Sequence, residues 1–362
     1  MLDLDTPALV VDLSVMERNI QAMASFAADA GVRLRPHTKT HKCPEIARMQ
    51  IDAGASGITV AKLGEAEVMA DAGLDDLLVA YPIVGEAKLA RLHALRDRAR
   101  VRVSLDSVEV ARGVGSVGSA ADPVEVLIEV DTGHHRMGRP SGEPTVALVT
   151  QVARIPGVEV VGLLSHAGHA YQAGSDDVAA IAAGEAADLA DTAEACGGAG
   201  VEIREISVGS TPTARAVSGA AGITESRPGT YVFNDVQQMR LGVATEHDCA
   251  ARVLATVVAR PWEDRFVIDA GSKSLSSDGG DGPPFPGRGV LAGRPDLVLD
   301  LLTEEHGVGH VLPGGGGLSI GDRLEVIPLH VCACVNLSDT AAGVRDGRVE
   351  RELVIAGRGK VR

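Results

Sequence analysis

Short apolar runs alternate with helical stretches over roughly the first two-thirds of the chain. The runs are continuous and rich in Val, Leu and Ile, as expected for strands that are buried on both faces of a parallel sheet. They lie near residues 32–36, 57–61, 77–81, 101–105, 124–130, 159–165, 204–208 and 223–225. Between most of them lie Ala-, Leu- and Glu-rich segments at helical period, such as Lys62–Asp71, Glu86–Arg98 and Val178–Ala195. The pattern therefore predicts repeated strand–helix units.

Eight strands in about 220 residues is the number and length typical of a (β/α)8 barrel, with a doubly wound open sheet as the competing architecture. Before the barrel, residues 7–13 read as a short strand, and Ser14 with Glu17 resembles a capping box that starts a helix. After about residue 240, strand-like runs separated by Gly- and Pro-rich turns replace the helical pattern. We therefore predict a barrel over residues 13–238 and an all-β domain from 1–12 and 239–362.

Polar residues gather at the carboxyl ends of the predicted barrel strands, where the active sites of such barrels lie. In chain order these ends carry Lys39, Tyr81, Asp106, the segment 131–136, His166 with His169, Gly209–Thr211, and Arg227. The strands themselves are apolar, so this concentration of Lys, Arg and His is not expected by chance. A purely structural role would leave it unexplained.

Composition and charge exclude several classes of function. The net charge is −15, and a protein that binds nucleic acid or an anionic membrane needs a basic face instead. No apolar run is long enough to span a bilayer, and no signal segment precedes the first strand. The five cysteines are odd in number and do not resemble a disulfide framework, so we expect a reducing, cytoplasmic location.

The stretch Leu34–Lys42 places three basic residues and two histidines behind an apolar run, and Pro36 bars it from a helix interior. We predict that Lys39 is a Schiff-base lysine that carries pyridoxal phosphate, because neighbouring cations favour its neutral, nucleophilic amine. Lys42 is the rival lysine, but it adjoins the helix that Pro44 begins. The simpler alternative is a solvated basic turn.

Further cofactor contacts are expected at other strand ends. Gly209, Ser210 and Thr211 precede a helical start and suit a phosphate, although an ordinary N-cap turn has the same composition. Arg136 and Arg227 are candidates to bond the cofactor ring, and surface salt bridges are the alternative for each. His166 and Tyr171 lie where a ring could stack on the cofactor or bond to it.

A possible metal site follows from His330 and Cys332, which lie within an apolar run. In a strand, residues i and i+2 face the same side, and imidazole with thiolate favours Zn2+. Cys334 would lie on that face as a possible third ligand. Buried cysteines that pack as small apolar residues are the alternative.

Together these motifs resemble the fold-type III pyridoxal-phosphate enzymes, the alanine racemase superfamily, and within it the D-serine dehydratase and D-threonine aldolase group. The resemblance rests on the segments 35–42, Glu129–Gly133 with Arg136, Ser165–Tyr171, Val208–Thr213, Arg227–Asp235, Ile268–Lys273, Glu305–Gly307 and Pro328–Cys332. It implies an alanine racemase-type barrel with a β domain, a homodimer, the cofactor on Lys39, and a divalent metal, Zn2+ or another such as Mn2+, on His330 and Cys332. The cofactor-binding residues that it implies are Lys39, Arg136, His166, Tyr171, Gly209, Ser210, Thr211, Arg227, Gly229 and Tyr231.

The resemblance implies a lyase that acts on a D-3-hydroxy amino acid. The His-x-Cys pair and the Gly-Ser-Thr-Pro turn favour a D-serine dehydratase over a D-threonine aldolase, although Cys334 stands where a threonine is expected. A non-catalytic pyridoxal-phosphate-binding protein is a remoter alternative, and the β domain and metal pair count against it. D-serine, D-threonine, a 3-hydroxyaspartate and bulkier β-hydroxy amino acids all remain open as substrates.

Overall fold

The computed structural model describes residues 3–280 and 282–362, which divide into two compact units. The barrel unit comprises Ala22–Lys39, Ile46–Gly229 and Gly359–Arg362. The β unit comprises the chain up to Gln21, Thr40–Glu45 and Thr230–Arg358. The contact boundaries therefore differ by several residues from the predicted domain limits, which stay a prediction.

In the described part of the barrel unit, nine parallel strands form one sheet. Eight of them follow the order β2-β10-β9-β8-β6-β5-β4-β3, and the ninth, β7 (Arg139–Pro140), pairs with β6. The eight strands are β2 (Arg33–Leu34), β3 (Ile58–Val60), β4 (Asp76–Val79), β5 (Arg100–Leu105), β6 (Val124–Asp131), β8 (Val158–Ser165), β9 (Glu205–Val208) and β10 (Glu225–Ser226). A parallel bridge from His37 to Thr59 joins the two ends of this order and closes the barrel. The predicted (β/α)8 barrel is thus confirmed, and each of the eight strands overlaps one of the predicted apolar runs.

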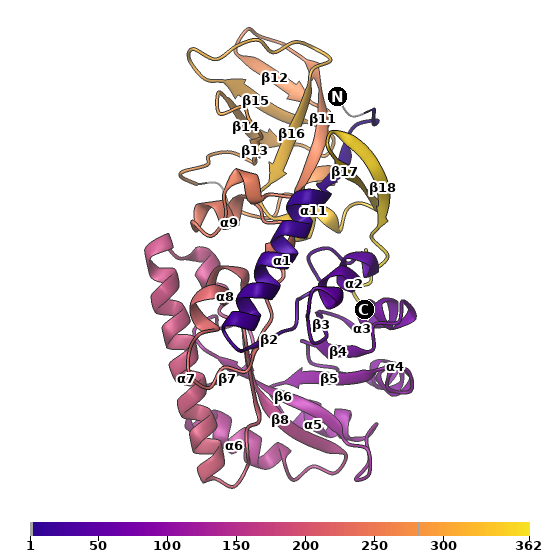
Figure 1. Cartoon of the computed structure of the whole chain (residues 1–362), viewed down its shortest axis with the longest axis vertical. Helices are drawn as coiled ribbons and strands as arrows, with labels where there is room; N and C mark the ends of the chain where they lie inside the picture. Colours follow the sequence, from indigo (N-terminus) through magenta and orange to yellow (C-terminus); the bar gives the residue numbers. More distant parts are fainter. Residues whose placement is uncertain (1–2, 281) are drawn as a thin grey trace. The chain divides into compact units, whose positions relative to one another are not determined.

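Helices separate the strands and lie outside the sheet (Figure 1). They are α1 (Leu13–Asp29), α2 (Pro44–Asp52), α3 (Leu63–Asp71), α4 (Glu86–Arg96), α5 (Val108–Gly115), α6 (Glu143–Val152), α7 (Val178–Gly198) and α8 (Thr211–Val217). Inside the barrel unit, Leu78, Leu127, Val161 and Leu164 form a buried cluster contributed by β4, β6 and β8. Across the described residues, no helix combines the length and apolar character that a bilayer crossing requires.

The start of α1 differs from the prediction. The backbone N–H of Val15 donates to Asp12 Oδ1 at 3.0 Å, so Asp12 caps the helix and Ser14 lies inside its first turn. Glu17 does not reach back to the cap, because it accepts two hydrogen bonds from Arg345 at 2.8 and 3.0 Å. The helix cap therefore lies two residues before the predicted Ser14, and the predicted capping box is wrong.

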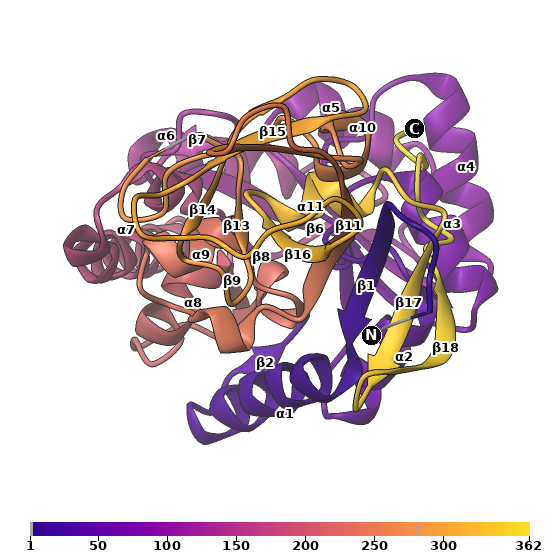
Figure 2. The same ribbon diagram turned by 90° about the horizontal axis from the view of Figure 1, so that it is seen from above.

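The β unit is built on a second sheet in which β1 (Ala8–Asp12) pairs antiparallel with β11 and parallel with β17 (Figure 2). Its other strands are β11 (Ala251–Ala259), β12 (Arg265–Ile268), β13 (Gly289–Leu291), β14 (Leu297–Leu302), β15 (Gly307–Val311), β16 (Arg323–Pro328), β17 (Thr340–Arg345) and β18 (Arg348–Val354). The expected pairing of the first strand into this sheet is confirmed. Three short helices are α9 (Val236–Arg240), α10 (Ser272–Leu275) and α11 (Val331–Val335), and the last two lie where no helix was predicted. At four or five residues each, they are too short to produce a helical period.

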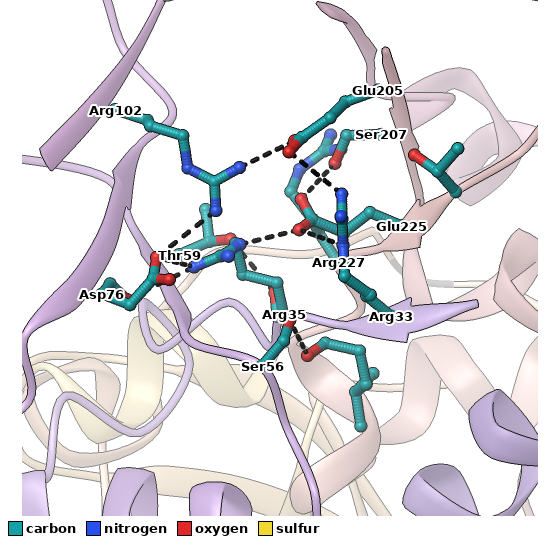
Figure 3. Close-up of polar contacts among 12 residues, drawn as sticks. Arg33, Arg35, Ser56, Thr59, Asp76, Arg102, Glu205, Ser207, Glu225 and Arg227 are labelled. Atoms are coloured by element: carbon teal, nitrogen blue, oxygen red, sulfur yellow. Dashed lines mark hydrogen bonds and ion pairs between the residues drawn. The ribbon is translucent and has the colours of Figure 1, made fainter. Parts of the chain in front are cut away.

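A network of ion pairs fills the amino-terminal end of the barrel (Figure 3). Arg35 contacts Glu225 at 2.8 Å and Asp76 at 2.6 Å, and both Arg35 and Glu225 are buried. Arg102 contacts Glu205 at 2.7 Å and Asp76 at 3.3 Å. Burial alone would raise the pKa of Glu225, but Arg35, Arg102 and a hydrogen bond from Ser207 hold it below its usual value. The network joins β2, β4, β5, β9 and β10 through their charges.

We expect Glu225→Ala to destabilise the protein by about 3–5 kcal/mol, because it leaves the buried guanidinium of Arg35 without its fully buried carboxylate partner. Urea denaturation followed by circular dichroism measures the loss. Glu159→Ala is the matched control, because it removes an exposed ion pair with Arg204 and should change the free energy of unfolding by less than about 1 kcal/mol. Equal effects of the two substitutions would contradict a special role for the buried network.

Candidate functional site

Four predicted site residues come together within the barrel unit. Lys39, Arg136 and Arg227 are close enough for their charges to act on the imidazole of His166. They follow β2, β6 and β10, and His166 follows β8, so the carboxyl ends of the sheet position all four. Desolvation, with the charges of Lys39 and Arg136, lowers the pKa of His166 well below its usual value. The site thus combines three cationic side chains with a neutral imidazole.

His37 is a further member of this cluster that was not predicted as a site residue. Its pKa is also well below its usual value, because of desolvation first and then the charges of Lys39, Arg227 and His166. Its Nδ1 lies 3.3 Å from the backbone nitrogen of Lys39 and accepts a hydrogen bond from it. His37 therefore helps to fix the backbone that presents the Lys39 amine.

Arg227 is buried and rigidly held. Its Nη1 donates to Ser207 Oγ at 2.6 Å, and its Nη2 donates to the carbonyl oxygen of Ser165 at 2.5 Å. Burial lowers the pKa of Arg227, although Glu225, Glu185 and Glu129 oppose this effect. Neutral oxygens, and not carboxylates, accept these two hydrogen bonds, so the charge of Arg227 favours an anionic or electron-rich partner in the site.

The turn after β9 packs closely against β10. Gly209 has φ of +125°, and a Cβ there would lie 2.9 Å from the backbone nitrogen of Arg227, so only glycine fits without movement. Its carbonyl oxygen lies 3.3 Å from His166 Nδ1. The Ser210 hydroxyl is 2.9 Å from that of Thr213 in a capping box at the start of α8.

A buried hydroxyl at this turn suits an anionic group. Ser226 Oγ would lie 3.4 Å from a Cβ on Gly209, and it has no hydrogen-bond partner among the described residues. The close-packed glycine, this free hydroxyl and the neighbouring cationic cluster together fit the phosphate and ring of pyridoxal phosphate.

Two buried carboxylates support the cluster, and neither was predicted to have a role. Glu129 lies 3.8 Å from Arg136, and burial raises its pKa despite the charges of Arg136 and Arg227. Glu185 of α7 accepts a hydrogen bond from Ser165 Oγ at 2.5 Å, and burial raises its pKa as well. Glu185 could have been found from the sequence, because it is an acidic residue among the apolar positions that α7 buries.

For four other predicted cofactor-binding residues, the structure gives the element or unit in which each lies. Tyr171 lies in the 3-10 turn Gly168–Gln172, and Thr211 is the first residue of α8. Gly229 is the last residue of its segment in the barrel unit, whereas Tyr231 is a buried residue of the β unit. The roles of these four residues stay predictions.

The metal pair adopts a different backbone from the one predicted. His330 is the N-cap of α11, and Cys332 lies within this helix, so the predicted strand is wrong here. In a helix, residues i and i+2 point in opposite directions, about 200° apart. Cys334 accordingly points away from Cys332 and donates to the carbonyl oxygen of Ser274 at 3.1 Å. Burial raises the pKa of the Cys334 thiol to about 12, which is unfavourable for a metal ligand.

His330 and Cys332 nevertheless remain neighbours, because the N-cap geometry brings the imidazole beside the thiol. Burial would lower the pKa of His330, but contact with Cys332 and the carboxylates of Asp235 and Asp278 raises it to about 10. The described residues contain no cluster of three or more His, Cys, Asp or Glu side chains arranged to hold a metal. An imidazole and a thiol in anionic surroundings still fit a divalent ion that takes two protein ligands.

Two protein-family models match the chain. The alanine racemase N-terminal domain matches residues 11–236, and a serine dehydratase domain matches residues 250–344.

Similar proteins are known over nearly the whole length. D-threo-3-hydroxyaspartate dehydratase of Delftia sp. (strain HT23) is 37% identical over 92% of this chain and 92% of its own. D-threonine aldolase of Arthrobacter sp. is 35% identical over 98% of this chain and 93% of its own. The crystal structure of D-threonine aldolase from Filomicrobium marinum is 34% identical, covers 99% of this chain and 97% of its own, and superimposes with a TM-score of 0.91.

Solved structures of D-threo-3-hydroxyaspartate dehydratase include two variants in which a histidine, or a cysteine two positions later, is replaced by alanine. The cysteine variant is described as the metal-free form. The spacing of these two residues is the same as that of His330 and Cys332.

We expect His37 and His166 to stay neutral in conditions where an ordinary histidine gains a proton. Because the unfolded chain binds these protons more readily, the stability that the neutral rings contribute is complete above about pH 6.5 and falls as the pH drops below that value. The measurement is the imidazole NMR shift between about pH 8 and about pH 5, assigned with His37→Gln and His166→Gln. A midpoint near 6.5 for either ring would contradict the cationic cluster.

Proposed function

The chain belongs to the alanine racemase family whose members carry a C-terminal serine dehydratase domain, and we propose that it is a lyase dependent on pyridoxal phosphate and a divalent metal. It is an enzyme of the D-serine dehydratase and D-threonine aldolase type. The proposed reaction is dehydration of a D-3-hydroxy amino acid, with D-serine as the first candidate, to a 2-oxo acid and ammonia. The observation that carries this proposal is the cationic cluster around Lys39 together with the His330–Cys332 pair.

The barrel unit supplies the groups that would hold the cofactor. When bound through Lys39, pyridoxal phosphate supplies an electron sink that acidifies the Cα–H bond of an amino acid. The turn of Gly209, Ser210 and Thr211 would bind the phosphate. Arg136 and Arg227 would bond the ring, with the neutral imidazole of His166 against it.

Lys39 would act as the base. Its amine would take the Cα proton of the substrate, in a cluster that also holds Arg136 and Arg227. His37 would keep the backbone of Lys39 in place during this transfer.

The β unit supplies the metal ligands. A Zn2+ or similar ion on His330 and Cys332 supplies Lewis acidity toward the β-hydroxyl of the substrate. Support comes from D-threo-3-hydroxyaspartate dehydratase, in which a cysteine at the same spacing was replaced in the metal-free form. The thiol and the imidazole lie beside each other in this chain, as two ligands of one ion require.

A dehydratase is preferred because the Delftia relative that shares the His-x-Cys spacing is named a dehydratase. The second candidate is retro-aldol cleavage to glycine and an aldehyde, and it is favoured by the 35% identity to one D-threonine aldolase and the TM-score of 0.91 to another. We also propose a homodimer that acts on small molecules in the cytoplasm, as the sequence suggested.

The purified protein supplied with pyridoxal phosphate should show a visible band near about 420 nm, because the bound cofactor is conjugated to a lysine nitrogen. Lys39→Ala should abolish the band. The control is Lys42→Ala, which should retain it, because the carbonyl oxygen of Lys42 accepts a hydrogen bond from Gly357 in the β unit and its side chain is buried there. Loss of the band in Lys42→Ala alone would refute the assignment.

The products distinguish the two lyase reactions. Incubation with D-serine should give pyruvate and ammonia, and thorough removal of metal should abolish turnover without removing the visible band. Glycine and acetaldehyde from D-threonine, with no 2-oxo acid from any D-3-hydroxy amino acid, would establish the aldolase instead. Turnover that is unchanged after metal removal would contradict a role for His330 and Cys332.

A further inference from the structure

We propose that Asp278 and Asp235 are positioning residues for the metal pair, with Asp278 orienting the His330 ring and Asp235 fixing the backbone between the two ligands. The inference rests on the proposed function, because it concerns the same metal. All the contacts involved lie within the β unit.

Asp278 determines which nitrogen of His330 faces a metal. Its Oδ2 lies 2.8 Å from His330 Nδ1, which is a short, charge-assisted distance. A carboxylate that accepts from Nδ1–H fixes the tautomer in which the lone pair is on Nε2. The same contact limits rotation of the ring about its bond to Cβ. Asp278 therefore presents Nε2 of His330 as the ligand atom.

Asp235 holds the backbone at the residue between the two ligands. Its Oδ2 accepts a hydrogen bond from the N–H of Val331 at 3.0 Å, and its Oδ1 accepts one from the N–H of Gln238 at 3.0 Å. The side chain is completely buried. One carboxylate thus caps α9 and, at the same time, binds the first N–H of α11.

This second cap is necessary because α11 lacks one of its own. His330 occupies the N-cap position, and its side chain makes no capping hydrogen bond. A five-residue helix with uncapped N–H groups is only marginally stable, so its start needs an external acceptor. Asp235 supplies the acceptor and leaves the His330 imidazole free to bind a metal.

A hydroxyl supports the second ligand in a similar way. Thr40 Oγ1 lies 3.1 Å from Cys332 Sγ, and Thr230 Oγ1 lies 3.8 Å from the same sulfur. A hydroxyl that donates to a thiolate limits its rotation and stabilises its charge. Each ligand of the pair, and the peptide between them, is thereby held by a separate group.

The β unit also offers a matched control for Asp278. His310 Nδ1 lies 2.8 Å from Asp300 Oδ2, which is the same contact at the same distance. That pair joins the neighbouring strands β14 and β15, and Asp300 also contacts Arg265. A substitution of Asp300 therefore removes an equivalent His–Asp pair at a place that is not assigned to metal binding.

The test is Co2+ binding to the metal-stripped, cofactor-loaded full chain, followed by the thiolate-to-cobalt and d–d absorption bands and by competition with a chromophoric chelator. We expect Asp278→Ala to weaken Co2+ binding by roughly 10–100-fold, as is usual when a carboxylate behind a ligand histidine is removed. Asp278→Asn should weaken it less, because an amide oxygen still accepts from Nδ1–H. Asp300→Ala should leave it unchanged.

Asp235→Asn should also weaken binding, because an amide has only one oxygen and cannot accept from both Val331 and Gln238. It should shift the d–d bands, since the angle between the two ligands depends on the backbone of α11. Circular dichroism and the visible cofactor band check that the variant is folded. If Asp235→Asn does not fold, the Asp278 variants still test the proposal, because Asp278 is exposed and its substitution leaves the core unchanged.

Two negative results have different meanings. No Co2+ or Zn2+ binding by the unaltered protein would overturn the proposed metal function and this inference with it. Normal binding by the unaltered protein, with Asp278→Ala and Asp235→Asn both within about twofold of it, would overturn the inference and leave the proposed function standing.

Discussion

One buried arginine, Arg35, links the strands on both sides of the closing seam of the barrel, the place where β2 lies between β10 and β3. β2 is only two residues long, but backbone hydrogen bonds join the segment around it to the segment of β10 on one side and to that of β3 on the other. Arg35 follows β2 directly and pairs with Glu225 of β10 and Asp76 of β4, which lie on opposite sides of the seam. A buried guanidinium is stable only when it is paired, so these contacts specify one register for the segment. That segment continues, four residues later, to Lys39.

The position of Lys39 is therefore fixed by contacts with the neighbouring strand segment at Thr59 and by a contact within its own turn. Thr59 Oγ1 donates to the carbonyl oxygen of Arg35, and Thr38 donates from its backbone and side chain to the carbonyl oxygen of Thr59. Behind the lysine, His37 accepts from its backbone nitrogen. A base that must reach a particular proton has to be held within a fraction of an ångström. The contacts that close the barrel therefore also hold the backbone of Lys39 in the position that the proposed proton transfer needs.

The sequence predicted the barrel well because its strands are buried on both faces and are therefore continuous apolar runs. In the β unit the sequence predicted strand-like runs at residues 251–259, 265–269, 323–328 and 349–355. β14 and β15 were missed, since they are partly exposed and interrupted by polar or glycine positions. The metal pair was found from residue types alone, but its backbone was not, because a five-residue helix has no period. Asp278 and Asp235 were out of reach of any local pattern, as they lie 52 and 96 residues from the groups that they bind.

The central claim is that Lys39, held by this seam, carries the cofactor. Borohydride reduction of the pyridoxal-phosphate-loaded protein, followed by proteolysis and mass spectrometry, fixes the cofactor permanently on whichever lysine bears it. We predict a pyridoxyl group on Lys39 at near-stoichiometric occupancy. Modification of Lys42 in its place, or scattered labelling of surface lysines, would contradict the account and with it the assignment of the cationic cluster as the active site.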